Sequence, residues 1–425
     1  MESGSLREVV TKACCNGNRR AIGTPVEQSS ADDVGVSAMN VVPDVVTAAR
    51  RLVPQIVATR EEAERLRHVP QALSDALAAA GLYQMFLPRT LGGLELSPLT
   101  VFEAVETVSA ADGSVGWCVI NGNFPAYFSA WLAPDVARDM FGTPPTLRAA
   151  GSLRPQGRAW PVEGGYRVKG QWNFVSGLHN ATWLYCTSLV MDGDAPRLTK
   201  KGAPVTRAMW IPAAAAKFLD TWSVMGMRGS GSHDFVINDV FVPASNTGSL
   251  AEPPMQTGTL YRHRALFTVV LSLFSANALG IARGAIDSLM EIASHRATTQ
   301  SSLLLRDRPD VQLILGQAEA ITSAARSFVT DSLVRFWNAL CDDDTDLSNH
   351  IARTRLSCVH AIHESLRAVD LAFHTAGTNG IYTANPLERH FRDIHVAVQH
   401  NAAFKVHYES AGKVFLGLRP TEPGW

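Results

Sequence analysis

The stretch "GMRGSGSHDF" (residues 226–235) has the composition of a phosphate-binding loop and decides how the middle of the chain folds. Glycine-rich loops suit anions because bare backbone N–H groups can approach a phosphate closely. The dinucleotide fingerprint G-x-G-x-x-G needs a third glycine where Asp234 stands, and a Walker loop needs a G-K-[ST] ending that is absent. Both motifs also open a helix. The following "FVINDVFVP" (235–243) instead ends at a proline and alternates large apolar residues: Phe235, Ile237, Val240 and Val242. This alternation predicts a strand, and the glycine-rich stretch is therefore predicted to be a turn between strands.

The composition is that of an ordinary globular protein. The chain has 425 residues, of which 46% are hydrophobic and 18% are charged, and this length suffices for two or three domains. Its 38 basic and 39 acidic residues give a net charge of −1. Such a balance creates no field that attracts nucleic acid or an anionic membrane, so we expect neither partner.

The cysteines and the apolar segments indicate a cytoplasmic protein. None of the 6 cysteines forms a C-x-x-C pair, and we expect reduced thiols. The N-terminus lacks the apolar core of a secretory signal. An uncharged segment at 265–282 reaches the lower limit of membrane-spanning length, but it is diluted by Ser272, Ser275, Asn277 and Gly280. We therefore expect a helix buried within a bundle.

The chain divides into a leader and three regions of different periodicity. Residues 1–40 are rich in Ser, Gly and Asn and are expected to be a disordered leader. Residues 41–146 show a helical pattern, whose first part ends at Gly81, a predicted helix C-cap. Short β-type runs fill 147–250 and indicate a small barrel or sandwich, and long helices return in 256–425.

Two kinds of catalytic site are not supported by the motifs. The chain has 13 histidines, but neither H-E-x-x-H nor its inverse occurs, and no glutamate has a histidine three residues later. We therefore expect no metal. The serines in "GSGSH" lack the G-x-S-x-G spacing of a hydrolase nucleophile.

A histidine near the C-terminus stands in an apolar pattern. Helical spacing relates it to other residues of one stripe, which contains Ala397, His400, Phe404, Tyr408, Ala411 and Phe415. From spacing alone, His400 is either a core histidine bonded to a backbone carbonyl or a histidine that lines a buried cavity. In the second case its near-neutral pKa suits proton transfer.

Six stretches between about residues 41 and 418 resemble the acyl-CoA dehydrogenase superfamily. They are "AAAGLYQMFLPRTLGG", "AADGSVGWCV", "GGYRVKGQWNFVSG", "WSVMGMRGSGSHDFVINDVFVP", "ALGIARGAI" and "NPLERHFRDIHVAVQH". The resemblance implies an α+β fold with an N-terminal helical domain, a central β-barrel domain and a C-terminal four-helix bundle. It also implies a homotetramer, or at least a dimer, because the family pairs such bundles across two-fold axes.

Within the superfamily, "FVSG" and "GMRGSGSHDF" are most similar to the two-component flavin-dependent monooxygenases, which include 4-hydroxyphenylacetate, secosteroid and dibenzothiophene oxygenases. In that branch, a serine matching Ser176 lies beside flavin N5 and a histidine stands where His400 does. The resemblance therefore implies that both are catalytic, and for His400 it favours the cavity-lining role. Further flavin contacts implied by the resemblance are Ser152, Trp172, Asn173, Phe174, Arg228 and Ser232. For Arg228 and Ser232 the alternative is a turn that only shapes the β-domain.

The dehydrogenase branch is a weaker match. Many of its members place a catalytic glutamate shortly after an Arg-Asp pair, but "IHVAVQHNAAF" follows Arg392-Asp393 and the next carboxylate is Glu409. The chain also departs from related aromatic hydroxylases, which often have a histidine soon after the Gly-Trp pair. Here "CVINGNFPAYFSAW" follows Gly116-Trp117. Its aromatic residues either line an apolar substrate pocket or pack in the core: Phe124, Tyr127 and Phe128.

The absence of a nicotinamide fingerprint fits an oxygenase that receives its flavin already reduced. The resemblance then implies reduced FMN or FAD supplied by a separate reductase, O2, and a small, cyclic or aromatic substrate. Two other functions remain open from the sequence. One is a flavin-dependent dehydrogenase of acyl thioesters, and the other is a non-catalytic binding protein on the same fold.

Overall fold

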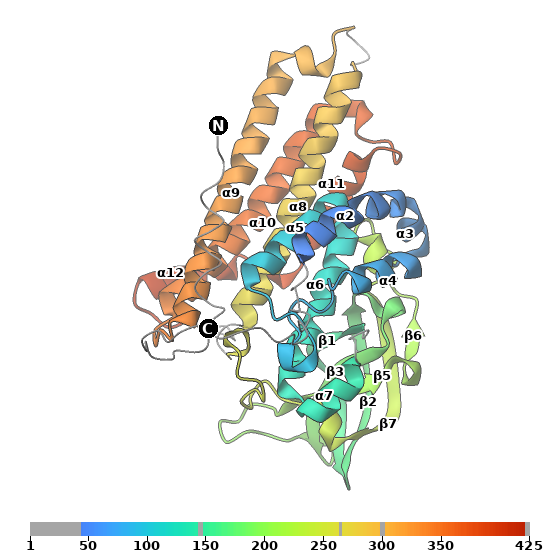
Figure 1. Cartoon of the computed structure of the whole chain (residues 1–425), viewed down its shortest axis with the longest axis vertical. Coiled ribbons are helices and arrows are strands. Elements are labelled where there is room, and N and C mark those ends of the chain that lie inside the picture. The colour runs from blue at the N-terminus through green and yellow to red at the C-terminus, as the bar shows by residue number, and fades with distance from the viewer. Residues whose placement is uncertain (1–43, 143–147, 263–265, 298–301, 421–425) are drawn as a thin grey trace, which may run out of the picture.

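The computed structural model describes residues 44–142, 148–262, 266–297 and 302–420, and these follow an α–β–α order (Figure 1). The long C-terminal helices run side by side at one end of the molecule, and the sheet lies at the other. Helices of the N-terminal region, with α6 prominent among them, stand between the two. This architecture confirms the predicted order of helical and β regions. The predicted leader, 1–40, lies outside the described residues.

The N-terminal region is built from short helices whose ends follow the local sequence. They are α2 (Val45–Ala58), α3 (Arg60–Leu66), α4 (Gln71–Ala79), α5 (Pro98–Ala111), α6 (Gly113–Phe128) and α7 (Pro134–Phe141). Helix α4 ends as predicted, because Gly81 adopts a φ of 76° and its N–H bonds to Ala78 O, while Leu82 N–H bonds to Leu77 O. The Asp112 side chain caps α6 by accepting from Val115 N at 3.0 Å.

The central strands form one mixed sheet. They are β1 (Ala149–Val162), β2 (Gly165–Val175), β3 (Trp183–Asp192), β4 (Ala195–Pro196), β5 (Thr206–Pro212), β6 (Lys217–Leu219), β7 (His233–Pro243) and β8 (Thr247–Gly248). The order across the sheet is β6-β7-β2-β1-β3-β5-β8, with β4 paired to β3. No pairing between the end strands β6 and β8 closes this order among the described residues, so the predicted barrel is not confirmed.

Strand β7 confirms that the glycine-rich stretch is an inter-strand turn. Phe235 and Ile237, at odd-numbered positions, are buried, and so is Val242, at an even-numbered one. The inward-facing positions of the strand therefore switch from odd to even numbers between Ile237 and Val242. The register with β2 shifts between Val168 and Gly170. One extra β7 residue, with Asp239 at φ 58°, absorbs the shift. The changed alternation in the sequence is therefore the signature of a β-bulge.

The C-terminal region consists of long helices and two shorter ones. They are α8 (Leu266–His295), α9 (Pro309–Cys341), α10 (Ser348–Ala376), α11 (Pro386–Ala397) and α12 (Val406–Phe415). Helix α8 packs against α5, α9, α10 and α11. By length and composition it could cross a membrane, but 83% of its apolar window is buried inside the protein. The expectation of a buried bundle helix for this segment is confirmed.

Helices α5 and α8 approach closely because α8 presents glycines at the contact. A Cβ atom added at Gly280 would lie 2.5 Å from Glu106 O and 2.9 Å from Ala110 N. At Gly284 it would lie 2.5 Å from Ala110 O. These glycines allow the two backbones to meet, which joins the N-terminal helices to the C-terminal bundle.

We expect Gly280→Ala to lower the melting temperature, because overpacking of this kind costs about 1–3 kcal/mol. Gly316→Ala is the matched control, since Gly316 is an exposed glycine of α9 with no atom within 4 Å of an added Cβ. That change replaces a poor helix former and should leave stability equal or higher. Thermal unfolding of both variants checks the expectation. Equal melting temperatures would show that the α5–α8 contact is not close-packed.

Candidate active site

A chain of hydroxyl groups lies where β2, the turn before β7 and helix α6 meet. Ser176 Oγ lies 2.8 Å from Ser232 Oγ, which lies 2.7 Å from Ser230 Oγ. Trp117 Nε1 donates to Ser176 Oγ at 3.0 Å. All three serines are buried. A hydroxyl group can make three hydrogen bonds, so Ser176 retains one position for a further partner.

Strained backbone precedes Ser176. The register between β2 and β7 shifts between Trp172 and Val175, which leaves Phe174 as an extra residue at φ 59°. The Phe174 residue is 63% exposed. A left-handed conformation is uncommon for a bulky residue, and bulges next to active sites redirect side chains. The bulge turns Phe174 outward and keeps Ser176 inward beside Trp117.

The residues between β6 and β7, hereafter the 220–232 turn, supply Ser230, Ser232 and a cationic side chain. Met227 in this turn is also left-handed, at φ 55°. Arg228 follows it, and its buried Nε has no hydrogen-bond partner among the described residues. A buried guanidinium nitrogen without a partner is costly, so this position favours an acceptor group from a ligand.

Aromatic side chains pack around Trp117, away from its bond to Ser176. The His400 ring lies 4.2 Å from the Phe274 ring and 5.3 Å from the Trp117 ring, between centroids. Phe274 belongs to α8, and its ring lies 4.8 Å from that of Trp117. Trp117 therefore contacts both the hydroxyl chain and the aromatic cluster. The structure places Ser176 and His400 on two sides of this one indole.

His400 does not lie on a helix, so the predicted helical stripe is wrong. Helix α11 ends at Ala397, and His400 precedes a short 3-10 turn, where its Nδ1 accepts from Ala402 N at 3.3 Å. Phe404, predicted to face the interior, is 52% exposed. The helical spacing failed because the chain turns between α11 and α12. Burial, followed by the charge of His407, lowers the pKa of His400 to about 4.

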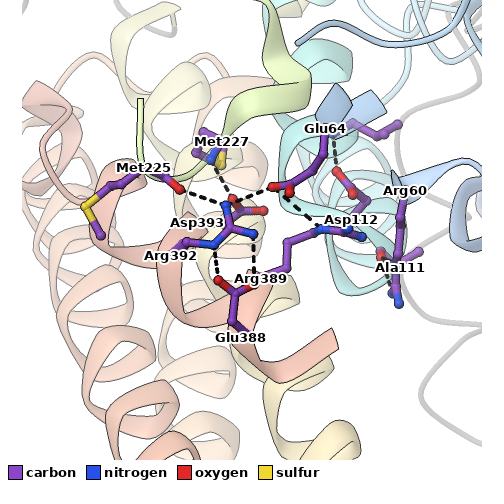
Figure 2. Close-up of polar contacts among 11 residues, drawn as sticks. Arg60, Glu64, Ala111, Asp112, Met225, Met227, Glu388, Arg389, Arg392 and Asp393 are labelled. Carbon is purple, nitrogen blue, oxygen red and sulfur yellow. Dashed lines mark hydrogen bonds and ion pairs between the residues drawn. The ribbon is translucent and has the colours of Figure 1, made fainter. Parts of the chain in front are cut away.

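A partly buried network of charged side chains joins the N-terminal helices to α11 (Figure 2). Its members come from α3, the α5–α6 junction and α11: Arg60, Glu64, Asp112, Glu388, Arg389, Arg392 and Asp393. Arg392 binds Glu64 at 2.8 Å and also binds Glu388. Burial, followed by the charge of Asp112, raises the pKa of Asp393 to about 7.

Several predicted flavin contacts lie away from this cluster. Trp172 was predicted to touch the cofactor, but its ring is fully buried in the sheet, stacked 5.2 Å from Phe235 and bonded to Thr187 O. Trp172 lies before the bulge, on the inward face of β2, so its place in the sheet core does not support the predicted contact. Ser152 Oγ accepts from Arg154 N, and Asn173 Oδ1 accepts from Arg154 at 3.5 Å. Neither of these side chains hydrogen-bonds to Ser176.

The three aromatic residues predicted for a substrate pocket separate into two groups. The Phe124 ring lies 6.1 Å from Phe274, at the edge of the aromatic cluster. Tyr127 donates to Leu260 O, and the structure buries it completely. The rings around Tyr127 and Phe128 are those of Phe86, Trp131, Tyr185 and Tyr261. Tyr127 and Phe128 therefore pack among core rings, and a role for either of them in a substrate pocket stays a prediction.

Sequence reasoning missed Trp117, Phe274 and the charge network as site residues. The Gly116-Trp117 and Arg392-Asp393 pairs mark the family resemblance in the sequence, and their spacing alone predicts no contact with the site. Phe274 lies in an uncharged helix that carries no chemical signal. Among the described residues, no group of three His, Cys, Asp or Glu side chains is placed to bind a metal ion.

Comparisons with known proteins identify the family. A model of the acyl-CoA dehydrogenase N-terminal domain matches residues 44–128, and a model of the C-terminal domain matches 272–404. An indole-3-acetate monooxygenase of Pseudomonas putida is 34% identical over 86% of this chain and 91% of its own length. The chain belongs to the acyl-CoA dehydrogenase superfamily. Within it, the protein is a member of the flavin-dependent monooxygenase branch.

Two solved structures of this branch resemble the monooxygenase closely. The 3-HSA hydroxylase of Rhodococcus sp. RHA1 has a TM-score of 0.81 and 25% identity, covering 90% of this chain and 99% of that one. XiaF of Streptomyces sp., solved with FADH2 and glycerol, has a TM-score of 0.79 and 26% identity. That match covers 89% of this chain and 96% of the other.

The residues of this monooxygenase suit a flavin. The free bonding position of Ser176 matches the N–H or nitrogen of an isoalloxazine ring, and the unpartnered Arg228 Nε suits an acceptor oxygen. The exposed Phe174 ring offers an apolar contact for a planar ring system.

We expect His400 to stay neutral when the folded protein is acidified from pH 7 to 5. The pKa of His400 in the folded protein, about 4, lies below the usual value of 6.5. On acidification, His400 is therefore protonated in the unfolded chain at a higher pH than in the folded protein. The stabilising contribution of neutral His400 is complete above about pH 6.5. It is lost as the pH falls through 4. NMR titration of the His400 ring, assigned with His400→Asn, measures this directly. A folded-state midpoint near 6.5 would contradict the burial argument.

Proposed function

We propose that the chain is the oxygenase component of a two-component monooxygenase, and that it oxygenates a small aromatic substrate with reduced flavin and O2. The proposal rests on the contacts of Trp117. Its indole N–H donates to Ser176 in the chain of hydroxyl groups, and its ring packs against His400 in the aromatic cluster. The named relatives support the substrate class, since they include monooxygenases of indole-3-acetate and a hydroxylase of resorcinol. When bound, reduced flavin supplies the electrons that activate O2.

Ser176 is proposed to hold the flavin at N5. Trp117 occupies one lone pair of the serine hydroxyl and Ser232 takes a second position, so the remaining one is fixed in direction. A hydroxyl oriented in this way reorganises little during the reaction, which is the basis of electrostatic preorganisation. Arg228 is proposed to bind a flavin oxygen.

His400 is proposed to move a proton between the reacting oxygen or the substrate and water. Its Nδ1 accepts a backbone N–H, so Nε2 carries the proton of the neutral ring. The lowered pKa keeps the imidazole uncharged at neutral pH, and a neutral ring can both give and accept a proton. Phe274 and Trp117 limit the access of water to it.

Phe124 is proposed to line the substrate pocket together with Phe274. Both rings are largely buried, and their centroids lie 6.1 Å apart. Aromatic substrates gain from offset or edge contacts with such rings. Ser152 and Asn173, which lie on neighbouring strands, remain proposed flavin contacts outside the hydroxyl chain.

The protein is further proposed to act in the cytoplasm as a homotetramer, with FMN or FAD supplied by a separate reductase. Helix α8 does not support assembly, because 83% of its apolar window is buried within one chain. Exposed apolar residues around α12 support it instead: Phe404, Phe415, Leu416 and Leu418. Light scattering that shows a monomer at micromolar concentration would contradict the tetramer.

The function is tested by adding chemically reduced FMN or FAD to the purified protein in aerated buffer with indole-3-acetate or resorcinol. We expect one of these substrates, or a related aromatic compound, to gain one oxygen atom from O2, as measured by mass spectrometry with ¹⁸O2. Reduction of bound oxidised flavin by an acyl thioester would instead identify a dehydrogenase. Binding of neither flavin would leave a non-catalytic protein.

Ser176→Ala should keep the fold and uncouple the reaction. The variant leaves Trp117 Nε1 without its acceptor and removes the proposed contact to N5. Loss of one buried hydrogen bond costs about 1–3 kcal/mol, so the hydrogen peroxide released per flavin oxidised should rise several-fold. Ser188→Ala is the control, because Ser188 is a fully buried serine of β3 that bonds to Cys186 O. Equal peroxide yields in the two variants would make Ser176 structural.

His400→Asn should lower the rate of substrate oxygenation by about 10²- to 10⁴-fold, the usual contribution of a general acid–base group. Asparagine is a good N-cap and can accept from Ala402 N as His400 does, so the local turn should persist. Flavin affinity should remain within a few-fold, and the fall of oxygenation as the pH drops through about 4 should disappear. A variant that loses only melting temperature and keeps the pH profile would make His400 a core histidine.

A further inference from the structure

The 220–232 turn is held in place by residues that lie far from it in the sequence. Asp393 Oδ1 accepts a hydrogen bond from Met227 N at 2.5 Å, across 166 positions. The neighbouring Arg392 donates to Met225 O at 2.7 Å (Figure 2). Gly226, between the two contacts, lies so close that an added Cβ would be 2.2 Å from Arg392 O. Two consecutive residues of α11 thus bind one strained segment of the turn.

The bond between Asp393 and the Met227 N–H lies directly before the residues of the turn that belong to the site. Met227 is left-handed, a conformation that a non-glycine residue keeps only when its surroundings impose it. Arg228, Ser230 and Ser232 follow within five positions. Trp222 Nε1 donates to Met227 O at 3.0 Å, so the Met227 residue is bonded on both sides. Release of its N–H would free the segment that carries the hydroxyl chain.

The other face of the Asp393 carboxyl is buried without a partner. Its Oδ2 has no hydrogen bond among the described residues and lies 3.2 Å from where a Cβ of Gly113 would be. Gly113 is the first residue of α6, which carries Trp117 four residues later. The Asp393 carboxyl therefore lies between the turn and the helix that supply the two sides of the site.

We propose that Asp393 is the positioning residue of the flavin site, and that it fixes the 220–232 turn through the Met227 N–H so that Arg228 and the serines meet the cofactor. The inference rests on the proposed flavin function. It assigns no chemical step to Asp393. What the turn requires from this residue is a hydrogen-bond acceptor, and a negative charge is not needed.

Two variants separate an acceptor role from a charge role. Asp393→Asn keeps an oxygen for the Met227 N–H, whereas Asp393→Ala removes it. Ile394→Ala is the control, since Ile394 is the adjacent residue of α11, is fully buried, and has an apolar side chain that cannot hydrogen-bond to the turn. It should reduce stability by a comparable amount without touching the turn.

The first measurement is hydrogen exchange of peptides covering 222–232 in the flavin-free protein. We expect exchange about tenfold faster in Asp393→Ala, as for a loss of roughly 1.4 kcal/mol, and wild-type exchange in Asp393→Asn and Ile394→Ala. The second is the dissociation constant for FMN and FAD. It should rise about tenfold in Asp393→Ala alone.

The outcomes are distinct. Exchange in Asp393→Ala that matches Ile394→Ala overturns the inference. If Asp393→Ala does not fold, faster exchange in Asp393→Asn overturns it and unchanged exchange supports it. Faster exchange with unaltered flavin affinity overturns the link to the cofactor. If the wild-type protein binds neither flavin, the proposed function fails, while the exchange data still decide whether Asp393 fixes the turn.

Discussion

The hydrogen bond from Met227 N to Asp393 is the contact on which the geometry of the site depends. It joins the C-terminal bundle to the turn before β7 at a point where the backbone is strained. A buried carboxyl is costly, and Arg392 and the backbone donor of Met227 offset only part of this cost, because the pKa of Asp393 stays raised to about 7. Helix α6 begins next to the same carboxyl. The Asp393 side chain therefore lies where the N-terminal helices, the β region and the C-terminal bundle meet.

In the site, the indole ring of Trp117 lies between a group of polar side chains and a group of aromatic ones. On one side, Trp117 donates to Ser176 and so orients a chain of buried hydroxyls. On the other side, its ring packs against Phe274 and His400, where burial keeps the histidine neutral. An oxygenase needs both environments next to each other, since polar groups bind the flavin while a dry wall protects the reacting oxygen.

The same fold serves dehydrogenases, so the local chemistry and not the architecture decides the activity. After Arg392-Asp393, helix α11 ends at Ala397, and His400 lies in the turn that follows it. Asp393 does not replace the catalytic glutamate of a dehydrogenase, because its side chain faces the 220–232 turn and is buried behind the site. Asp393 of the Arg-Asp pair thus holds the 220–232 turn in place in this protein.

The sequence by itself determined the α–β–α order, the cap at Gly81, the buried α8 and the strand after the glycine-rich turn. Each of these is a local or periodic property, and even the bulge at Asp239 is visible in the changed alternation of β7. Through family resemblance it also named Ser176 and His400. Only the tertiary structure showed that Trp117 connects them, since 59 positions separate the tryptophan from the serine.

The tertiary structure also corrected side-chain directions. Trp172 and Phe174 are two residues apart, and simple strand alternation would put them on one face. The bulge lies between Trp172 and Val175. Because of it, Trp172 points into the sheet core and Phe174 lies at the surface. Likewise, no spacing rule relates Met227 to Asp393. Such contacts depend on how distant elements pack, because strand registers and helix approaches are set by close packing of the whole core.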